Sequence, residues 1–279
     1  MQLTIQGQEV FAATGGVAHR TGRPLAVFVH GAGLDHTVWA LQSRWLAFHG
    51  WNVLALDLPG HGRSAGAPLP TIEDQAQWLQ ALIAAVCEPG VATPSAPTPV
   101  ALIGHSMGSL IALEAAARVP ASVQHLVLIG TALAMPVHPD LLAAAAANEH
   151  AAIDMVNLWG YGASAGLGGS RAPGVWMVGA GERILEKARP GVLHNDLAAC
   201  QGYRGAAAAA AQVTAPTLLI CGERDLMTPL KSARALAANL SKATLTVLAQ
   251  AGHMLPAERP YEVMDAIGAH LAVKRSRAA

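Results

Sequence analysis

The sequence predicts an α/β fold, a mostly parallel twisted sheet with helices on both faces. Three observations lead to this prediction. Short apolar runs alternate with helical segments from Leu25 onward. Polar turns, several with glycine, follow these runs. The chain has 279 residues, of which 52% are hydrophobic and 13% charged, which suits one large domain with a sizeable core. Such alternation is typical of parallel sheets, because a crossover helix must link successive strands.

The expected strands are apolar runs too short to be helices. They lie at residues 25–29, 53–57, 100–103, 126–129, 217–221 and 244–248, and an antiparallel edge pair is expected at residues 3–5 and 10–13. The expected helices lie at residues 38–48, 72–86, 107–118, 230–240 and 261–271. The alternation breaks between Thr131 and Gln212, where the chain is mainly helical and rich in alanine and glycine.

Within that break, Pro139 suits the first turn of a helix that can run to Leu158. A glycine-rich stretch of low complexity follows at residues 160–170, and we expect it to be mobile. It does not follow a strand, so it does not match a phosphate-binding loop. Shorter helices are expected at residues 183–187, 192–200 and 206–212.

The turn after the run at residues 100–103 carries the strongest functional signal. It reads Gly104-His105-Ser106-Met107-Gly108, a Gly-x-Ser-x-Gly motif between a strand and a helix that Pro120 closes. A serine in such a strained turn projects its hydroxyl to where a base can reach it, and the glycines avoid Cβ clashes. We expect Ser106 to be a nucleophile.

Two later strands end in residues that suit a serine nucleophile. The run at 217–221 leads into Gly222-Glu223-Arg224-Asp225, and the run at 244–248 leads to Gly252-His253. Nucleophile, acid and histidine in this chain order are found in α/β-hydrolases. Each residue follows the carboxyl end of a strand, where open α/β sheets bind ligands. We expect Asp225 to orient His253, and His253 to act as the base.

The turn after the first long strand offers a further catalytic element. It reads His30-Gly31-Ala32-Gly33. Such a turn can aim a backbone N–H at an acyl oxygen, and the residue after the nucleophile supplies a second one. We expect Ala32 and Met107 to form the oxyanion hole through their backbones.

The chain resembles the α/β-hydrolase fold family, in particular small bacterial esterase-like serine hydrolases. The resemblance runs from Leu25 to about Leu271 and includes residues 57–64 (DLPGHGRS) and 252–260 (GHMLPAERP). It implies a helical cap at residues 132–212 over a core formed by residues 1–131 and 213–279. It also implies hydrolysis of a carboxylic ester, or a related lactone or thioester, through an acyl-enzyme. The serine nucleophile disfavours the dehalogenase and epoxide hydrolase branches, which use aspartate.

Other activities share these residues. A cofactor-free perhydrolase or haloperoxidase-like enzyme uses the same triad, and a C–C bond hydrolase shares triad and cap. A ligand sensor on this fold hydrolyses slowly, so it shows a burst and then near silence, which steady-state turnover distinguishes. We expect no cofactor and no metal, since neither a dinucleotide fingerprint nor zinc-type spacing is present.

Several residues are weaker candidates for the same roles. Asp57 also ends a strand, but its turn suggests a structural contact, for which Arg63 is the candidate partner. We expect His30 to support the oxyanion turn, His61 to be structural and the side chain of His105 to point away from Ser106. His150 and Asp154 lie one helical turn apart, but no third metal ligand is apparent, so a solvated face is expected.

Composition limits the partners. The 18 basic and 18 acidic residues balance, so nucleic acid is not expected. No apolar run reaches the ~18 residues of a membrane helix, and the N-terminus lacks a signal-peptide pattern, so we expect a cytoplasmic protein. Cys87, Cys200 and Cys221 are expected to be buried thiols. The substrate is expected to be uncharged and of small to medium size, in contact with Gly31, Met227 and Met254. The oligomeric state is left open.

Overall fold

A computed structural model describes residues 1–87, 98–119, 121–170, 172–174 and 176–273. In this part of the chain eight strands form one sheet, in the order β1-β2-β4-β3-β5-β6-β7-β8. The strands are β1 (Gln2–Ile5), β2 (Gln8–Ala13), β3 (Leu25–Val29), β4 (Asn52–Leu56), β5 (Val100–His105), β6 (Val123–Ile129), β7 (Thr217–Gly222) and β8 (Ala243–Leu248). The pairs β1–β2 and β2–β4 are antiparallel and the remaining pairs are parallel, which confirms the predicted fold class.

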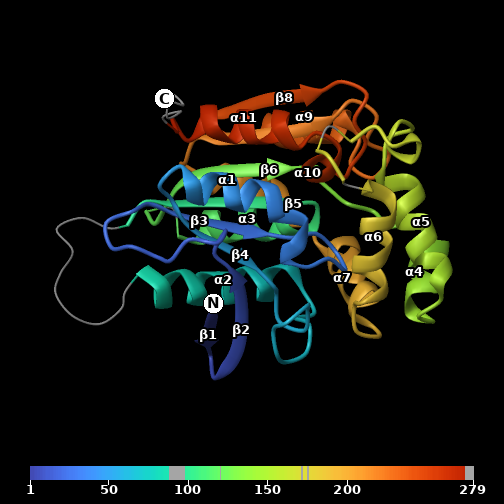
Figure 1. The fold of residues 1–279 in the computed structure, drawn as a ribbon, viewed down its shortest axis with the longest axis horizontal. Coiled ribbons are helices and arrows are strands. Elements are labelled where there is room, and N and C mark those ends of the chain that lie inside the picture. The colour runs from blue at the N-terminus through green and yellow to red at the C-terminus, as the bar shows by residue number, and fades with distance from the viewer. Residues whose placement is uncertain (88–97, 120, 171, 175, 274–279) are drawn as a thin grey trace.

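Helices cover both faces of this sheet (Figure 1). One face packs against α2 (Ile72–Cys87), α3 (Met107–Arg118), α8 (Ala206–Gln212) and α9 (Leu230–Ala237). The other packs against the 3-10 turn η1 (His36–Trp39), α1 (Ala40–Phe48), α10 (Leu255–Glu258) and α11 (Pro260–His270). Within β3, Val27 faces the first layer and Phe28 the second. Strands β3, β5 and β7 are therefore buried on both faces, which explains their largely apolar sequences.

The helices between β6 and β7 gather mostly at one end of the sheet (Figure 1). They are α4 (Pro139–Ala146), α5 (His150–Gly160), the 3-10 turn η2 (Ala165–Leu167), α6 (Met177–Glu186) and α7 (Val192–Gly202). Helices α4 to α7 bury a small apolar cluster of their own, which also includes Leu34 and Met254 from loops of the core. By contrast, α8 lies against α3. The boundaries at residues 131 and 212 stay a prediction.

One helix expected here is two helices. The prediction of a single helix from Pro139 to Leu158 is wrong, because α4 and α5 are separated at Asn148, which adopts a φ of 54°. Asparagine tolerates this left-handed conformation better than most residues. The helix expected at residues 183–187 is the end of the longer helix α6.

Some expectations concern parts of the chain outside the described residues: most of the loop at residues 89–99, the helix stop at residue 120 and the tail from residue 274. Within the described residues, no helix is both long enough and apolar enough to cross a bilayer.

Candidate active site

The turn between β5 and α3 holds Ser106 in a strained conformation. Its φ and ψ are 54° and −122°, which costs a non-glycine residue about 1–3 kcal/mol unless its surroundings hold it. The flanking glycines make the turn sterically feasible. A Cβ on Gly104 would lie 2.1 Å from the Gly108 carbonyl oxygen, and one on Gly108 would lie 2.2 Å from the Val29 oxygen. The glycines therefore let β3, β5 and α3 meet beneath the serine.

Asp225 and His253 meet at the ends of β7 and β8. The His253 Nδ1 lies 2.8 Å from Asp225 Oδ2, and both side chains are buried. The other oxygen of Asp225 accepts the backbone N–H groups of Met227 and Thr228, at 2.8 and 2.7 Å. Burial raises the pKa of Asp225, but the His253 imidazole and these hydrogen bonds outweigh it, so the pKa lies below its usual value. Asp225 is therefore an ionised acceptor for His253 Nδ1.

Thr228 is a member of this group that the sequence analysis missed. Its hydroxyl lies 2.6 Å from Asp225 Oδ2 and 3.2 Å from His253 Nδ1. The Asp-x-x-Thr spacing was the available signal, because a side chain three residues on can turn back onto an aspartate. With Nδ1 donating to Asp225, the Nε2 of His253 is left as an acceptor. That buried atom has no hydrogen-bond partner among the described residues.

His105 lies next to His253 and does not compete with it as a base. Its Nε2 lies 2.9 Å from the His253 carbonyl oxygen, and its ring centre is 4.9 Å from that of His253. Burial and the neighbouring His253 lower the pKa of His105 to about 3. The ring is therefore neutral and donates to the backbone of the loop that carries His253.

The turn after β3 passes close to Ser106. A Cβ on Gly31 would lie 3.1 Å from the Ser106 Cβ, so the backbone itself approaches the serine. His30 Nδ1 donates to the Gly31 oxygen at 2.9 Å, and Leu58 N–H donates to His30 Nε2 at 3.1 Å. His30 is buried and supports the turn from below, in the manner expected from the sequence.

A cavity of about 350 Å³ opens beside Ser106. Ser106 and His253 line it, as do Ala32 and the three residues expected to contact substrate, Gly31, Met227 and Met254. Met107 is buried behind the serine. The other walls of the cavity are largely apolar. They come mainly from the helices between β6 and β7: Leu141, Val156, Trp159, Leu193, Leu197 and Cys200. Sequence reasoning did not find these residues, because nothing in an alanine-rich helix marks the side that faces inward.

The loop that carries His253 is attached to the segment above it. The carbonyl oxygen of Gly160, at the end of α5, accepts the N–H groups of His253 and Met254 at 2.8 and 3.0 Å. One oxygen of the buried Glu258 accepts the N–H groups of Gly162 and Gly252, each at 3.0 Å. The histidine loop and the end of α5 are thus joined by backbone hydrogen bonds.

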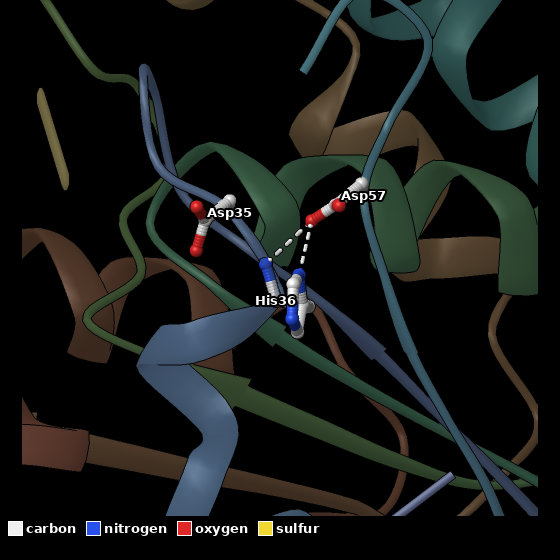
Figure 2. Close-up of side chains that lie close together, drawn as sticks. All are labelled: Asp35, His36 and Asp57. Atoms are coloured by element: carbon white, nitrogen blue, oxygen red, sulfur yellow. Dashed lines mark hydrogen bonds and ion pairs between the residues drawn. The ribbon is translucent and has the colours of Figure 1, made fainter. Parts of the chain in front are cut away.

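The carboxylate of Asp57 has partners other than His253, among them His36 (Figure 2). Its Oδ1 accepts from the backbone and ring nitrogens of His36, each at 2.8 Å, and its Oδ2 accepts the Arg63 N–H at 2.8 Å. The expected Arg63 contact thus involves the backbone. The Arg63 guanidinium instead lies 3.8 Å from the centre of the Phe11 ring. Figure 2 draws Asp35 close to His36 and Asp57 but with no dashed line to either. The Asp35 carboxylate instead caps η1 through Thr37 N–H.

A group of potential metal ligands lies on the surface, around His150. His150 of α5 meets Asp154 at 3.3 Å, as its spacing predicts, but also Glu186 of α6 at 3.2 Å. Glu182 approaches at 4.0 Å. The solvated face expected for His150 and Asp154 is confirmed, since their side chains are 52% and 68% exposed. The sequence did not show Glu182 and Glu186, because α6 lies beside α5 only in the fold. Glu186 is also paired with Arg183, so the cluster is satisfied as a surface ion-pair network.

The three cysteines differ in their surroundings. Cys200 and Cys221 are buried, as expected, and burial raises the pKa of each thiol. Cys87 at the end of α2 is only partly buried, so the expectation of burial is wrong for it.

Comparison with known proteins identifies the family. A family model described as serine aminopeptidase, S33, matches residues 21–260. This chain belongs to the S33 family of α/β-hydrolases. It is therefore a hydrolase by family as well as by fold.

Relatives and solved structures agree with this assignment. A pimeloyl-[acyl-carrier protein] methyl ester esterase from Aromatoleum aromaticum is 34% identical over 248 residues, which cover 83% of this chain and 91% of that protein. A putative carbamate hydrolase from Klebsiella pneumoniae is 27% identical, covering 83% of this chain and 85% of that protein. The enol-lactonase of Burkholderia xenovorans superimposes with a TM-score of 0.83 at 23% identity, covering 98% of this chain and all of that one. That last likeness bears on the fold of this α/β-hydrolase.

Proposed function

We propose that this α/β-hydrolase is a serine esterase, which cleaves a small, uncharged carboxylic ester through an acyl-enzyme. One observation carries the proposal: Ser106 and His253 line the same cavity, and His253 keeps its Nε2 free while its Nδ1 is held by an ionised Asp225. This is the arrangement that a serine needs, because its hydroxyl is a weak nucleophile until a base takes its proton. The 34% identical relative, a methyl ester esterase, supports the same reaction type.

Each residue has a defined part in the proposed reaction. Ser106 Oγ bonds to the ester carbonyl carbon as His253 Nε2 takes its proton, and the carbonyl oxygen becomes an oxyanion. The backbone N–H groups of Ala32 and Met107 stabilise that charge, each by about 2.7–4 kcal/mol in the transition state. The bond to the alcohol oxygen then breaks and the alcohol leaves with the proton from His253. Water attacks the acyl-enzyme by the same steps, releasing the acid and restoring Ser106.

The cavity supports a neutral substrate. Its lining contains no lysine, arginine, aspartate or glutamate among the described residues, and its walls are largely leucine, valine, methionine and tryptophan. A substrate charge in such a site would lack a partner and would be costly to bury. A volume of about 350 Å³ is at the small end of ligand sites. We propose residues 132–212 as the cap that sets this limit.

The Ser106→Ala variant tests the proposal. It should lose ester hydrolysis and also lose labelling by a fluorophosphonate, while circular dichroism and melting temperature stay close to those of the wild type. Ser109→Ala is the matched control, because Ser109 lies one turn along α3 with its hydroxyl on the Ser106 carbonyl and Thr131. Label that persists in Ser106→Ala would show that another residue is the nucleophile.

Substrate chemistry is tested with p-nitrophenyl esters of graded acyl length. Each added methylene should raise kcat/KM by at most the factor that corresponds to about 0.8 kcal/mol of apolar burial. The value of kcat/KM should then fall when the cavity is full. A neutral acyl chain should be preferred over a chain of equal length that ends in a carboxylate. A preference for the anionic ester would overturn the neutral-substrate proposal. Sustained turnover, rather than one burst, separates an esterase from a ligand sensor.

A further inference from the structure

A fully buried carboxylate in helix α7 reaches the turn that carries the proposed oxyanion donor. Asp196 is 0% exposed, and its Oδ2 accepts the N–H of Gly33 at 2.9 Å. The two residues are 163 positions apart in the chain. Neither the proposed reaction nor the cavity wall uses Asp196, so this charge needs another explanation.

The partner of Asp196 is a second buried side chain, His61. The His61 Nε2 lies 2.7 Å from Asp196 Oδ2, and its Nδ1 lies 3.0 Å from the carbonyl oxygen of Pro59. Both neighbours are acceptors, so both ring nitrogens must carry a proton, and His61 is an imidazolium. Burial lowers the pKa of His61, but the charge and hydrogen bond of Asp196 outweigh it and raise the pKa above its ordinary value.

The neighbouring histidine has the opposite protonation state. The His30 ring centre lies 4.8 Å from that of His61, but His30 donates through Nδ1 and accepts through Nε2, so it is neutral. Burial and the nearby His61 lower its pKa to about 4. Of these two rings only His61 carries a positive charge, and Asp196 pairs with it.

The turn itself is held on both sides of Ala32. Before Ala32, the Gly31 oxygen accepts from His30 Nδ1 and from Leu34 N–H, the latter at 3.2 Å. After it, Gly33 donates to Asp196. A Cβ on Gly33 would lie 2.9 Å from a Leu193 methyl and 3.0 Å from a Leu185 methyl, so α6 and α7 also pack closely on the turn. The direction of the Ala32 N–H depends on the peptide planes that these contacts fix.

We propose that Asp196, paired with His61, is a positioning residue that keeps the oxyanion turn oriented for catalysis. Helix α7 therefore contributes to the rate of the reaction as well as to the shape of the cavity. This inference rests on the proposed function, since it presumes that Ala32 N–H stabilises an oxyanion. An oxyanion donor held in the wrong direction costs rate while leaving ground-state binding of a neutral ester largely unchanged.

The test compares Asp196→Asn with Arg189→Gln. Arg189 makes a different contact between this helical segment and the core, from Nη2 to the Ser64 oxygen at 2.6 Å and from Nη1 to the Gly66 oxygen at 3.2 Å. In Asp196→Asn, kcat should fall at least about tenfold, though less than the 10²–10³-fold loss of a whole donor, with KM nearly unchanged. Binding of a trifluoromethyl ketone, which forms an oxyanion on Ser106, should weaken by the same factor. Arg189→Gln should keep both values.

A second variant separates loss of the charge pair from a folding defect in Asp196→Asn. His61→Gln can still donate to Asp196 but removes the positive charge, and its kcat and ketone affinity should fall together. The double variant should be no slower than Asp196→Asn, because the two residues act as one unit. Folded variants with wild-type kcat and ketone affinity would overturn the inference. If the wild type itself fails to react with fluorophosphonate at Ser106, the proposed function fails instead.

Discussion

The two loops that carry the proposed catalytic groups are both fastened by a buried carboxylate, but by opposite routes. Glu258 belongs to α10 of the core and reaches across to Gly162, while also holding Gly252 beside His253. Asp196 belongs to α7 above the core and reaches down to Gly33, while pairing with His61. One loop is therefore held from below and the other from above.

The chemical difference lies in what faces each carboxylate. Glu258 Oε2 takes its hydrogen bonds from backbone N–H groups, and Oε1 has no hydrogen-bond partner among the described residues. Burial raises its pKa. Asp196 faces an imidazolium and forms an ion pair. A buried carboxylate that has lost its counter-charge is far more costly than one that holds neutral donors, so the two loops should respond differently to substitution and to pH.

The largest expected effect is on the side of His253. Asp225→Asn should reduce kcat by about 10⁴, the cost of the equivalent change in serine proteases, because His253 then adopts the wrong tautomer. Asp57→Asn should lower the melting temperature, by weakening the contacts with His36 and Arg63, and should change kcat much less. Steady-state kinetics on a neutral ester compare the two. A larger kcat loss in folded Asp57→Asn would mean that the acid is misassigned.

Acid should weaken both sides of the site together. His30 beside the oxyanion turn and His105 beneath His253 have pKa values lowered by burial to about 4 and about 3. In the unfolded chain these two histidines take up protons near pH 6.5, whereas in the folded protein they stay neutral at that pH. The free energy of unfolding should therefore decline as the pH falls below 6.5. Each histidine contributes on the order of 3–5 kcal/mol when titration is complete.

Chemical denaturation between pH 7 and pH 4 measures this decline. The variant His105→Gln should flatten the curve, since a glutamine can donate to the His253 oxygen and does not titrate. An unchanged slope in that variant would show that His105 is not a buried neutral histidine.

Alkali should weaken only the oxyanion side. The raised pKa of His61 means that the pair with Asp196 is fully formed below pH 6.5 and is lost as the pH rises through the folded-state value. The groups that act on His61 are Asp196, Asp57 and the neutral His30. Stability should therefore fall above pH 6.5, by at most about 1.4 kcal/mol per pH unit for one proton. Denaturation curves of Asp196→Asn should lack this decline of stability above pH 6.5. If the decline persists in that variant, another group causes it.

The smallest effect is expected when Glu258 is replaced by glutamine. In Glu258→Gln the amide oxygen can still accept from Gly162 and Gly252, so the free energy of unfolding should change by less than about 1 kcal/mol. Glu258→Ala leaves both N–H groups unpaired and should cost about 1–3 kcal/mol for each. Equal losses in the two variants, measured by denaturation at pH 7, would show that the charge of Glu258 matters more than its hydrogen bonds.

Local pattern predicted much of the core. The runs that became β3, β5 and β7 were readable because a strand buried on both faces is continuously apolar. The bounds of α3 followed from the turn at Ser106 and matched the prediction at both ends. The region between β6 and β7 was harder. Its alanine-rich stretches have no strong apolar face, and the break at Asn148 depends on a single residue's φ.

The sequence by itself determined the alternation of strands and helices and the position of Ser106, Asp225 and His253 after strand ends, because burial period and turn chemistry act over a few neighbouring residues. The tertiary structure decided which distant groups meet. His61 and Asp196 are 135 residues apart. The sequence predicted a structural role for His61 without a partner, and it made no prediction for Asp196. They pair because α7 packs over the turn at Gly33. A charge can be buried at that place only when the fold brings the opposite charge beside it.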